Sequence, residues 1–92
     1  MTEINIKALE YEVQFYSVDT SKYIDTDCNT VTFLNLGTAT ANIETVPLVQ
    51  NQSLQIGGNQ GEYTKQRFFI NFTTGAGLTQ NCVVILKRYK NL

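Results

Sequence analysis

Apolar and polar residues alternate with a period of two along most of the chain from residue 30 onward. In residues 38–43, two alanines and an isoleucine alternate with two threonines and an asparagine. Successive side chains of a strand point to opposite faces, so this alternation predicts strands with one buried face. Runs of this kind occupy residues 30–36, 38–43, 46–48, 53–56, 67–72 and 81–89. The pattern therefore predicts an all-β chain, a small antiparallel β-sandwich of about six to eight short strands.

Three of these runs have distinctive patterns. Pro47 cannot donate a ladder hydrogen bond, so residues 46–48 are predicted to lie at a sheet edge, after a turn at residues 44–45. Residues 81–89 are apolar on both faces in their first half, which indicates a central strand covered on both sides. Phe69 and Asn71 alternate with apolar neighbours and are predicted to be more exposed. The predicted inward-facing set is Val31, Phe33, Ala39, Ala41, Ile43, Leu54, Ile56, Phe68, Ile70, Phe72, Val84 and Leu86.

The first 29 residues are harder to interpret. Their apolar positions fit two strand segments with a phase slip, which a β-bulge would produce. Ile6, Leu9, Val13 and Tyr16 also fall at helical spacing, so a short helix is the alternative. Residues 19–29 are polar with three acids and are predicted to be a loop. At 92 residues, the chain has the length of one domain spanning residues 1–92, with residues 1–29 as an N-terminal arm or as edge strands.

Charge is scarce and unevenly distributed. Asn, Gln, Ser and Thr contribute 31 side chains against 15 charged ones, which suits surfaces that end against other subunits or simply reflects strand and turn preferences. Residues 1–62 carry eight acids against Lys7 and Lys22, a balance of −6, whereas residues 63–92 have a balance of +5. Either the molecule has an acidic side and a basic side, or strands from the two parts interleave and the charges are neutralised locally.

Little in the sequence points to catalysis. The chain has no histidine, which removes every His-dependent triad and metal site, and it has no phosphate-binding glycine motif. We therefore expect no enzyme activity and no cofactor. Cys28 and Cys82 are expected to be free thiols. A calcium site formed by Asp19, Asp25 and Asp27 is an alternative to a solvated turn, although this segment fails the calcium-loop pattern further on.

Lys87, Arg88 and Lys90, with Tyr89 among them, form a candidate basic contact patch. Such basic and aromatic clusters bind single-stranded nucleic acids in other proteins. The sequence pI of about 5.2 makes nucleic acid an unlikely partner. We therefore interpret the three cations as one half of a protein contact or as a solvated strand end. No apolar run is long enough to span a membrane, and no signal-peptide segment opens the sequence, so we expect no membrane association.

One phrase resembles a known family. Residues 30–43 have the sequence TVTFLNLGTATANI. The similar segment continues through VPL at 46–48 to QSLQIGG at 52–58. This resembles small virion proteins of tailed bacteriophages, especially the crAss-like phages of Bacteroidetes. The shared elements are a strand ending in Asn-x-Gly, a Thr/Ala strand, a Pro-Leu piece, a Ser-Leu strand ending in glycine, and a later aromatic strand. The resemblance covers about residues 30–72. Related phrases often have Asn-Gly and Pro-Gly where this chain has residues 44–45 and 50–51.

The resemblance implies an immunoglobulin-like sandwich that is displayed on, or cements, a virus particle. The expected function is that of a non-enzymatic auxiliary capsid or decoration protein that binds the major capsid protein or other virion subunits, alone or as a homo-oligomer. It would be synthesised in the host bacterial cytoplasm and end in the virion. The alternative is a fibre or tail module that recognises host surface carbohydrate through Tyr16, Tyr23, Tyr63 or Tyr89. A third interpretation is a small bacterial regulatory or inhibitor domain.

Overall fold

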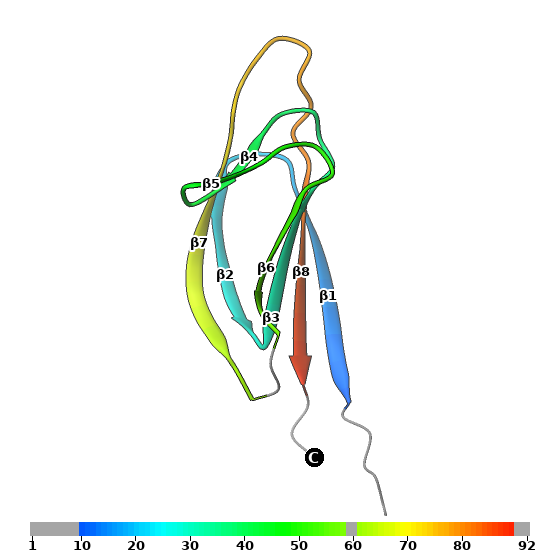
Figure 1. The fold of residues 1–92 in the computed structure, drawn as a ribbon, viewed down its shortest axis with the longest axis vertical. Helices are drawn as coiled ribbons and strands as arrows, with labels where there is room; N and C mark the ends of the chain where they lie inside the picture. The colour runs from blue at the N-terminus through cyan, green and yellow to red at the C-terminus, as the bar shows by residue number, and fades with distance from the viewer. Residues whose placement is uncertain (1–9, 59–60, 90–92) are drawn as a thin grey trace, which may run out of the picture.

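The computed structural model describes residues 10–58 and 61–89, which form two packed four-stranded antiparallel sheets (Figure 1). Sheet A has the order β1-β8-β3-β6, and sheet B has the order β2-β7-β4-β5. The strands are β1 (Tyr11–Val18), β2 (Lys22–Cys28), β3 (Thr30–Asn35), β4 (Ala41–Ile43), β5 (Val46–Leu48), β6 (Ser53–Gly57), β7 (Thr64–Phe72) and β8 (Cys82–Tyr89). The predicted small antiparallel β-sandwich is confirmed.

The core lies between the sheets and matches the predicted inward-facing set. Ten of its twelve members are buried, and Leu54 and Ile56 are partly buried and packed against the core. Phe33 and Phe68 come from opposite sheets, and their rings meet edge to face with centroids 5.5 Å apart. Phe69 is only partly buried and Asn71 is exposed, as predicted. The core has further members outside the predicted inward-facing set, namely Val18, Cys28, Leu48 and Cys82.

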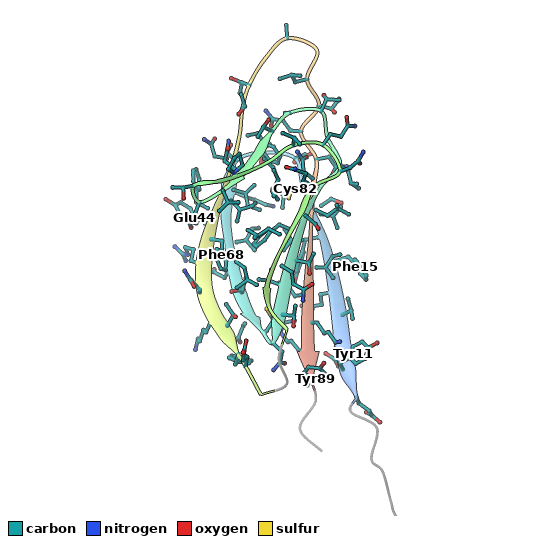
Figure 2. The ribbon with its side chains drawn as sticks, viewed as in Figure 1. Tyr11, Phe15, Glu44, Phe68, Cys82 and Tyr89 are labelled. Carbon is teal, nitrogen blue, oxygen red and sulfur yellow. The ribbon has the colours of Figure 1, made fainter. Side chains whose placement is uncertain are left out.

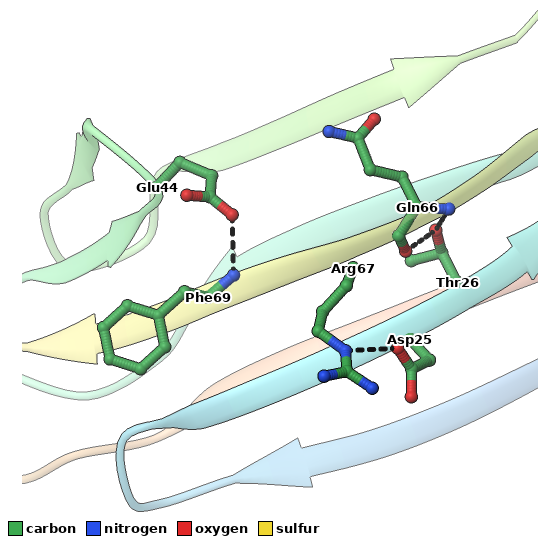
Figure 3. Close-up of polar contacts among 6 residues, drawn as sticks. All are labelled: Asp25, Thr26, Glu44, Gln66, Arg67 and Phe69. Carbon is green, nitrogen blue, oxygen red and sulfur yellow. Dashed lines mark hydrogen bonds and ion pairs between the residues drawn. The ribbon is translucent and has the colours of Figure 1, made fainter.

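The prediction of a loop at residues 19–29 is wrong, because β2 occupies most of this segment. Its acids misled the prediction. Asp25 and Asp27 lie on the outer side of the strand, while Thr26 and Cys28 take the buried inward positions between them. Thr26 tolerates burial because its hydroxyl donates a 2.7 Å hydrogen bond to the Gln66 carbonyl (Figure 3).

A short helix in the first part of the chain is also wrong for the described residues, since Val13 and Tyr16 lie in β1. Ile6 and Leu9, the other two residues of that helical pattern, lie outside the described residues. β1 and β2 are edge strands of the two sheets.

The β4–β5 hairpin turns at the predicted place. Glu44 has a positive φ of 54°, and its carboxylate accepts a 2.8 Å hydrogen bond from the Phe69 backbone N–H (Figure 3). This contact ties the turn to β7. β5 lies at the edge of sheet B, as Pro47 predicts. β4 is shorter than the predicted strand at 38–43, although Ala39 is still fully buried.

β8 is a central strand between β1 and β3, as its pattern predicts. Its inward residues Cys82, Val84 and Leu86 are buried. The outward residues Val83 and Ile85 are only partly buried. Among the described residues, the strand is therefore covered on one side and not on both.

Candidate functional site

The structure separates the members of the candidate basic patch. Alternation along β8 sends Lys87 to the outer face of sheet A and Arg88 to the inner side. The Lys87 ammonium lies 4.2 Å from the Tyr11 ring centroid and 5.0 Å from that of Tyr89. The Arg88 guanidinium donates instead to the backbone carbonyl of Asp27. Lys90 lies outside the described residues. Lys87 and Arg88 therefore do not share one surface.

The outer face of sheet A is a weakly charged surface that the strand register defines. Its members are Tyr11, Val13, Phe15, Ser17, Thr30, Thr32, Leu34, Ser53, Gln55, Gly57, Val83, Ile85, Lys87 and Tyr89. Among these residues, Lys87 is the only one with an ionised side chain. Phe15 is 68% exposed, and Tyr11 and Val13 are exposed as well. Figure 2 shows Tyr11, Phe15 and Tyr89 along β1 and β8, far from Phe68 between the sheets.

A shallow groove of about 240 Å³ crosses this face. β1 and β8 contribute Val13, Ile85 and Lys87 to it, and polar side chains of β3 and β6 form its other side. The Lys87 ammonium is held at this groove by the rings of Tyr11 and Tyr89, because a cation is attracted to the negative face of an aromatic ring. The side of the groove on β1 and β8 is mainly apolar and holds one positioned cation, which suits a protein partner that offers apolar side chains and an acid.

The outer face of sheet B is charged, in contrast. Asp25 of β2 forms a 2.8 Å ion pair with Arg67 of β7, and this pairing raises the pKa of the guanidinium (Figure 3). Asp27 lies opposite Lys65 in the same strand pair and accepts a hydrogen bond from the Tyr63 hydroxyl, which raises the pKa of that phenol. Acidic and basic strands thus interleave, so charge is neutralised locally here.

The four tyrosines proposed for carbohydrate binding do not form one cluster. Tyr16 and Tyr23 both line an open cleft of about 270 Å³ between β1 and β2, together with Lys22 and Asp25. Tyr89 lies on the outer face of sheet A. Tyr63 precedes β7, where its hydroxyl binds a carboxylate. Only the pair in the cleft therefore offers two aromatic rings to one ligand.

The cysteines and acids show no arrangement for chemistry within residues 10–58 and 61–89. No three His, Cys, Asp or Glu side chains of this part of the chain are grouped so as to hold a metal ion. Cys28 and Cys82 are free and buried. Burial makes both thiols inaccessible and raises their pKa, that of Cys82 to about 11, so they stay protonated at neutral pH.

The Asn-x-Gly motif at residues 35–37 has a structural role. The fully buried Asn35 amide donates 2.8 Å hydrogen bonds to the carbonyls of Ala39 and Leu48, and its oxygen accepts one from the Gly37 N–H. A Cβ at Gly37 would collide with the Thr79 carbonyl. The motif therefore fixes the loop after β3.

Comparisons with known protein families, curated proteins and solved structures find no match to this chain. No described segment forms a helix that could cross a membrane.

Proposed function

We propose that the chain is a non-enzymatic structural protein of a bacteriophage virion, an auxiliary capsid or decoration protein. In this proposal it is made in the host bacterial cytoplasm and binds the major capsid protein through the outer face of sheet A. The observation that carries the proposal is the exposure of Phe15 and Val13 on a face with one ionised group, Lys87. The phrase at residues 30–58 supplies the resemblance to virion proteins.

The physical argument is that apolar side chains on the outer face of sheet A are exposed to water and would gain free energy if a partner covered them. Apolar side chains on a strand gain free energy when they leave water, at roughly 25 cal/mol per Å² of apolar surface. Val83 and Ile85 form the centre of this face and are only partly covered. Contiguous exposed apolar surface on a soluble protein marks an interaction site.

Two exposed aromatic residues provide a matched test. Phe15 on β1 and Tyr23 on β2 are 68% and 63% exposed, and each lies on the outer face of an edge strand, one in each sheet. Purified Phe15→Asp and Tyr23→Asp variants are incubated with particles that lack this protein, and bound copies are quantified. We expect Phe15→Asp to lose occupancy and Tyr23→Asp to bind as the wild type does. Equal binding by both variants would refute the assignment of this face.

The Lys87 cation has its own test. Lys87→Glu reverses the one ionised group of the face, so occupancy should fall if a carboxylate of the capsid protein faces it. The wild-type contact is mainly apolar, so it should persist when the Debye length falls from about 10 Å at 0.1 M salt to about 3 Å at 1 M. Loss of all wild-type binding at 1 M salt would replace apolar burial with electrostatics as the basis of attachment.

Carbohydrate recognition on a fibre or tail is the second candidate, and the cleft that holds Tyr16 and Tyr23 favours it. Sugar rings stack on exposed aromatic faces beside amides and acids. In that case Tyr23→Asp would abolish saturable binding to a host glycan, and Phe15→Asp would not. The copy number separates the two functions as well, since decoration requires hundreds of copies per particle and a fibre only a few.

A further inference from the structure

In the part of the chain that the structure describes, β1 has a free edge with little of the usual protection against strand pairing. Among the described residues it pairs only with β8, and its other side is open (Figure 1). The strand is eight residues long, contains no proline or lysine, and carries one charged residue, Glu12. Native sheets normally blunt their edges with short strands, prolines, several charged side chains or bulges, because unpaired N–H and C=O groups recruit other strands.

The other three edges carry such devices. β5 has three residues with Pro47 in the middle. β6 is five residues long and ends at Gly57, whose φ is 87°. β2 carries three charged side chains, Lys22 among them. β1 is therefore the one edge among the described strands that is both long and open to pairing.

The backbone groups that face this edge follow from the hydrogen bonds of β8. The Asn81 carbonyl accepts from Leu36, and the Lys87 carbonyl accepts from Asn29, so the odd-numbered residues here face β3. Successive residues of an antiparallel strand face opposite neighbours, so the even-numbered residues of β8 face β1. The register Gln14↔Leu86 then places the even residues of β1 toward β8. The N–H and C=O groups of Tyr11, Val13, Phe15 and Ser17 thus face the open edge.

We propose that β1 binds β1 of a second copy of this chain, antiparallel, about a two-fold axis at Gln14. In this register, Val13 of each copy lies opposite Phe15 of the other copy. Tyr11 of each copy likewise lies opposite Ser17 of the other. Aromatic and β-branched residues are favourable cross-strand partners, and no like charges lie directly opposite. A register centred on Phe15 would instead place Val13 against Ser17 and lose both Val–Phe pairs.

The pairing joins the two A sheets into one continuous eight-stranded sheet. It covers part of Phe15, the most exposed of the large apolar side chains that the structure describes. The outer faces of the two copies become one face of twice the width. A seven-residue strand pair is smaller than a standard interface of about 1,600 Å², so the dimer should dissociate on dilution. The inference goes beyond the proposed function, since it requires no virion partner.

Two amides on edge strands of sheet A provide a matched test. Gln14 is on β1 and Gln55 is on β6, and both are exposed. Gln14→Glu places two carboxylates directly opposite each other at the axis, and still offers Arg88 the oxygen that accepts its hydrogen bond. Sedimentation equilibrium of the full chain should show a monomer–dimer equilibrium for the wild type and for Gln55→Glu. The Gln14→Glu dimer should be weaker by up to about fivefold at pH 7, and should recover near pH 3.

Cysteine variants report the register directly. Residues at a non-hydrogen-bonded pair lie about 4.5 Å apart between Cα atoms, within disulfide range. Gln14→Cys should therefore form a disulfide-linked dimer under mild oxidation, and Gln55→Cys should not; the buried Cys28 and Cys82 do not compete. A wild type that stays monomeric up to about 1 mM would overturn the proposal, and so would cross-linking at residue 55 and not at residue 14. The occupancy of virus particles is measured in a separate experiment. The dimer proposal and the capsid-binding proposal can therefore each fail while the other holds.

Discussion

The Arg67 Nε atom lies 2.8 Å from the Asp25 Oδ1 atom, and the two residues face each other across the β2–β7 strand pair. They come from the acid-rich and the base-rich parts of the sequence. β2 contributes two of the eight acids, and β7 contributes two of the seven cations. Of the two alternatives that the charge distribution leaves open, these strands show interleaving with local neutralisation.

This ion pair should add little to stability. The Asp25 and Arg67 side chains are 74% and 63% exposed, and an exposed pair contributes less than about 1 kcal/mol because water and salt screen it. We expect Asp25→Asn to lower the free energy of unfolding by under about 1 kcal/mol in urea denaturation, with the difference vanishing at high salt. A loss above about 2 kcal/mol would show that the pair has a structural role.

Asn35 should be far more sensitive. Asn35→Ala leaves the Ala39 and Leu48 carbonyls without their buried amide partner, whereas the Gly37 N–H still donates to the Asn81 carbonyl at 3.0 Å. Unsatisfied buried groups cost about 1–3 kcal/mol each, so we expect a loss on the order of 3 kcal/mol or more. Urea denaturation checks this, with Asn42→Ala as control, since the Asn42 amide makes its contacts in an exposed position. Equal effects of the two substitutions would contradict the assigned role.

Phe68 tests the core assignment. Phe68→Ala removes a buried ring that packs edge to face on Phe33, and such truncations cost about 3–5 kcal/mol. Phe15→Ala, at an exposed position, should change the stability of the monomer by no more than about 0.5 kcal/mol. Both values come from denaturation at micromolar concentration. Cooperative melting of Phe68→Ala at the wild-type midpoint would show that the faces of β7 are misassigned.

Cys82 should make stability fall at high pH. Burial raises the pKa of its thiol to about 11, whereas the thiol of an unfolded chain titrates near 8.5. Between these values the unfolded chain loses the proton and the folded chain keeps it, so the free energy of unfolding decreases as pH rises. We expect a shallower decrease between about pH 8.5 and 11 in Cys82→Ala. Denaturation across this range measures the slopes, and identical slopes would show that Cys82 does not contribute.

The strands with regular alternation were predictable, and the pairing between strands was not. Phe68, Ile70 and Phe72 repeat every second residue, so their shared buried face followed from the sequence. β2 was missed because Thr26 stands where an apolar residue is usual, and its burial depends on the Gln66 carbonyl of a strand 40 residues away. Which strands are neighbours depends on such distant contacts.

The candidate site was only partly predictable. Lys87 and Arg88 are adjacent in the sequence, yet the alternation within residues 81–89 already implied opposite faces for them. The apolar pattern on both sides of this strand was the signal for the outer face of sheet A. The pattern predicts coverage of both faces within the chain, whereas Val83 and Ile85 remain partly exposed. The sequence does not indicate whether such a face is covered by its own chain or by another molecule.

The buried Asn35 side chain and the Arg88 side chain lie toward opposite ends of the sandwich, and each joins one sheet to the other. The amide of Asn35 in β3 binds the Leu48 carbonyl in β5, and the guanidinium of Arg88 in β8 binds the Asp27 carbonyl in β2. Apolar packing between two sheets is not directional, so it resists separation better than it resists sliding. The two polar contacts are directional, so they fix the position of one sheet along the other.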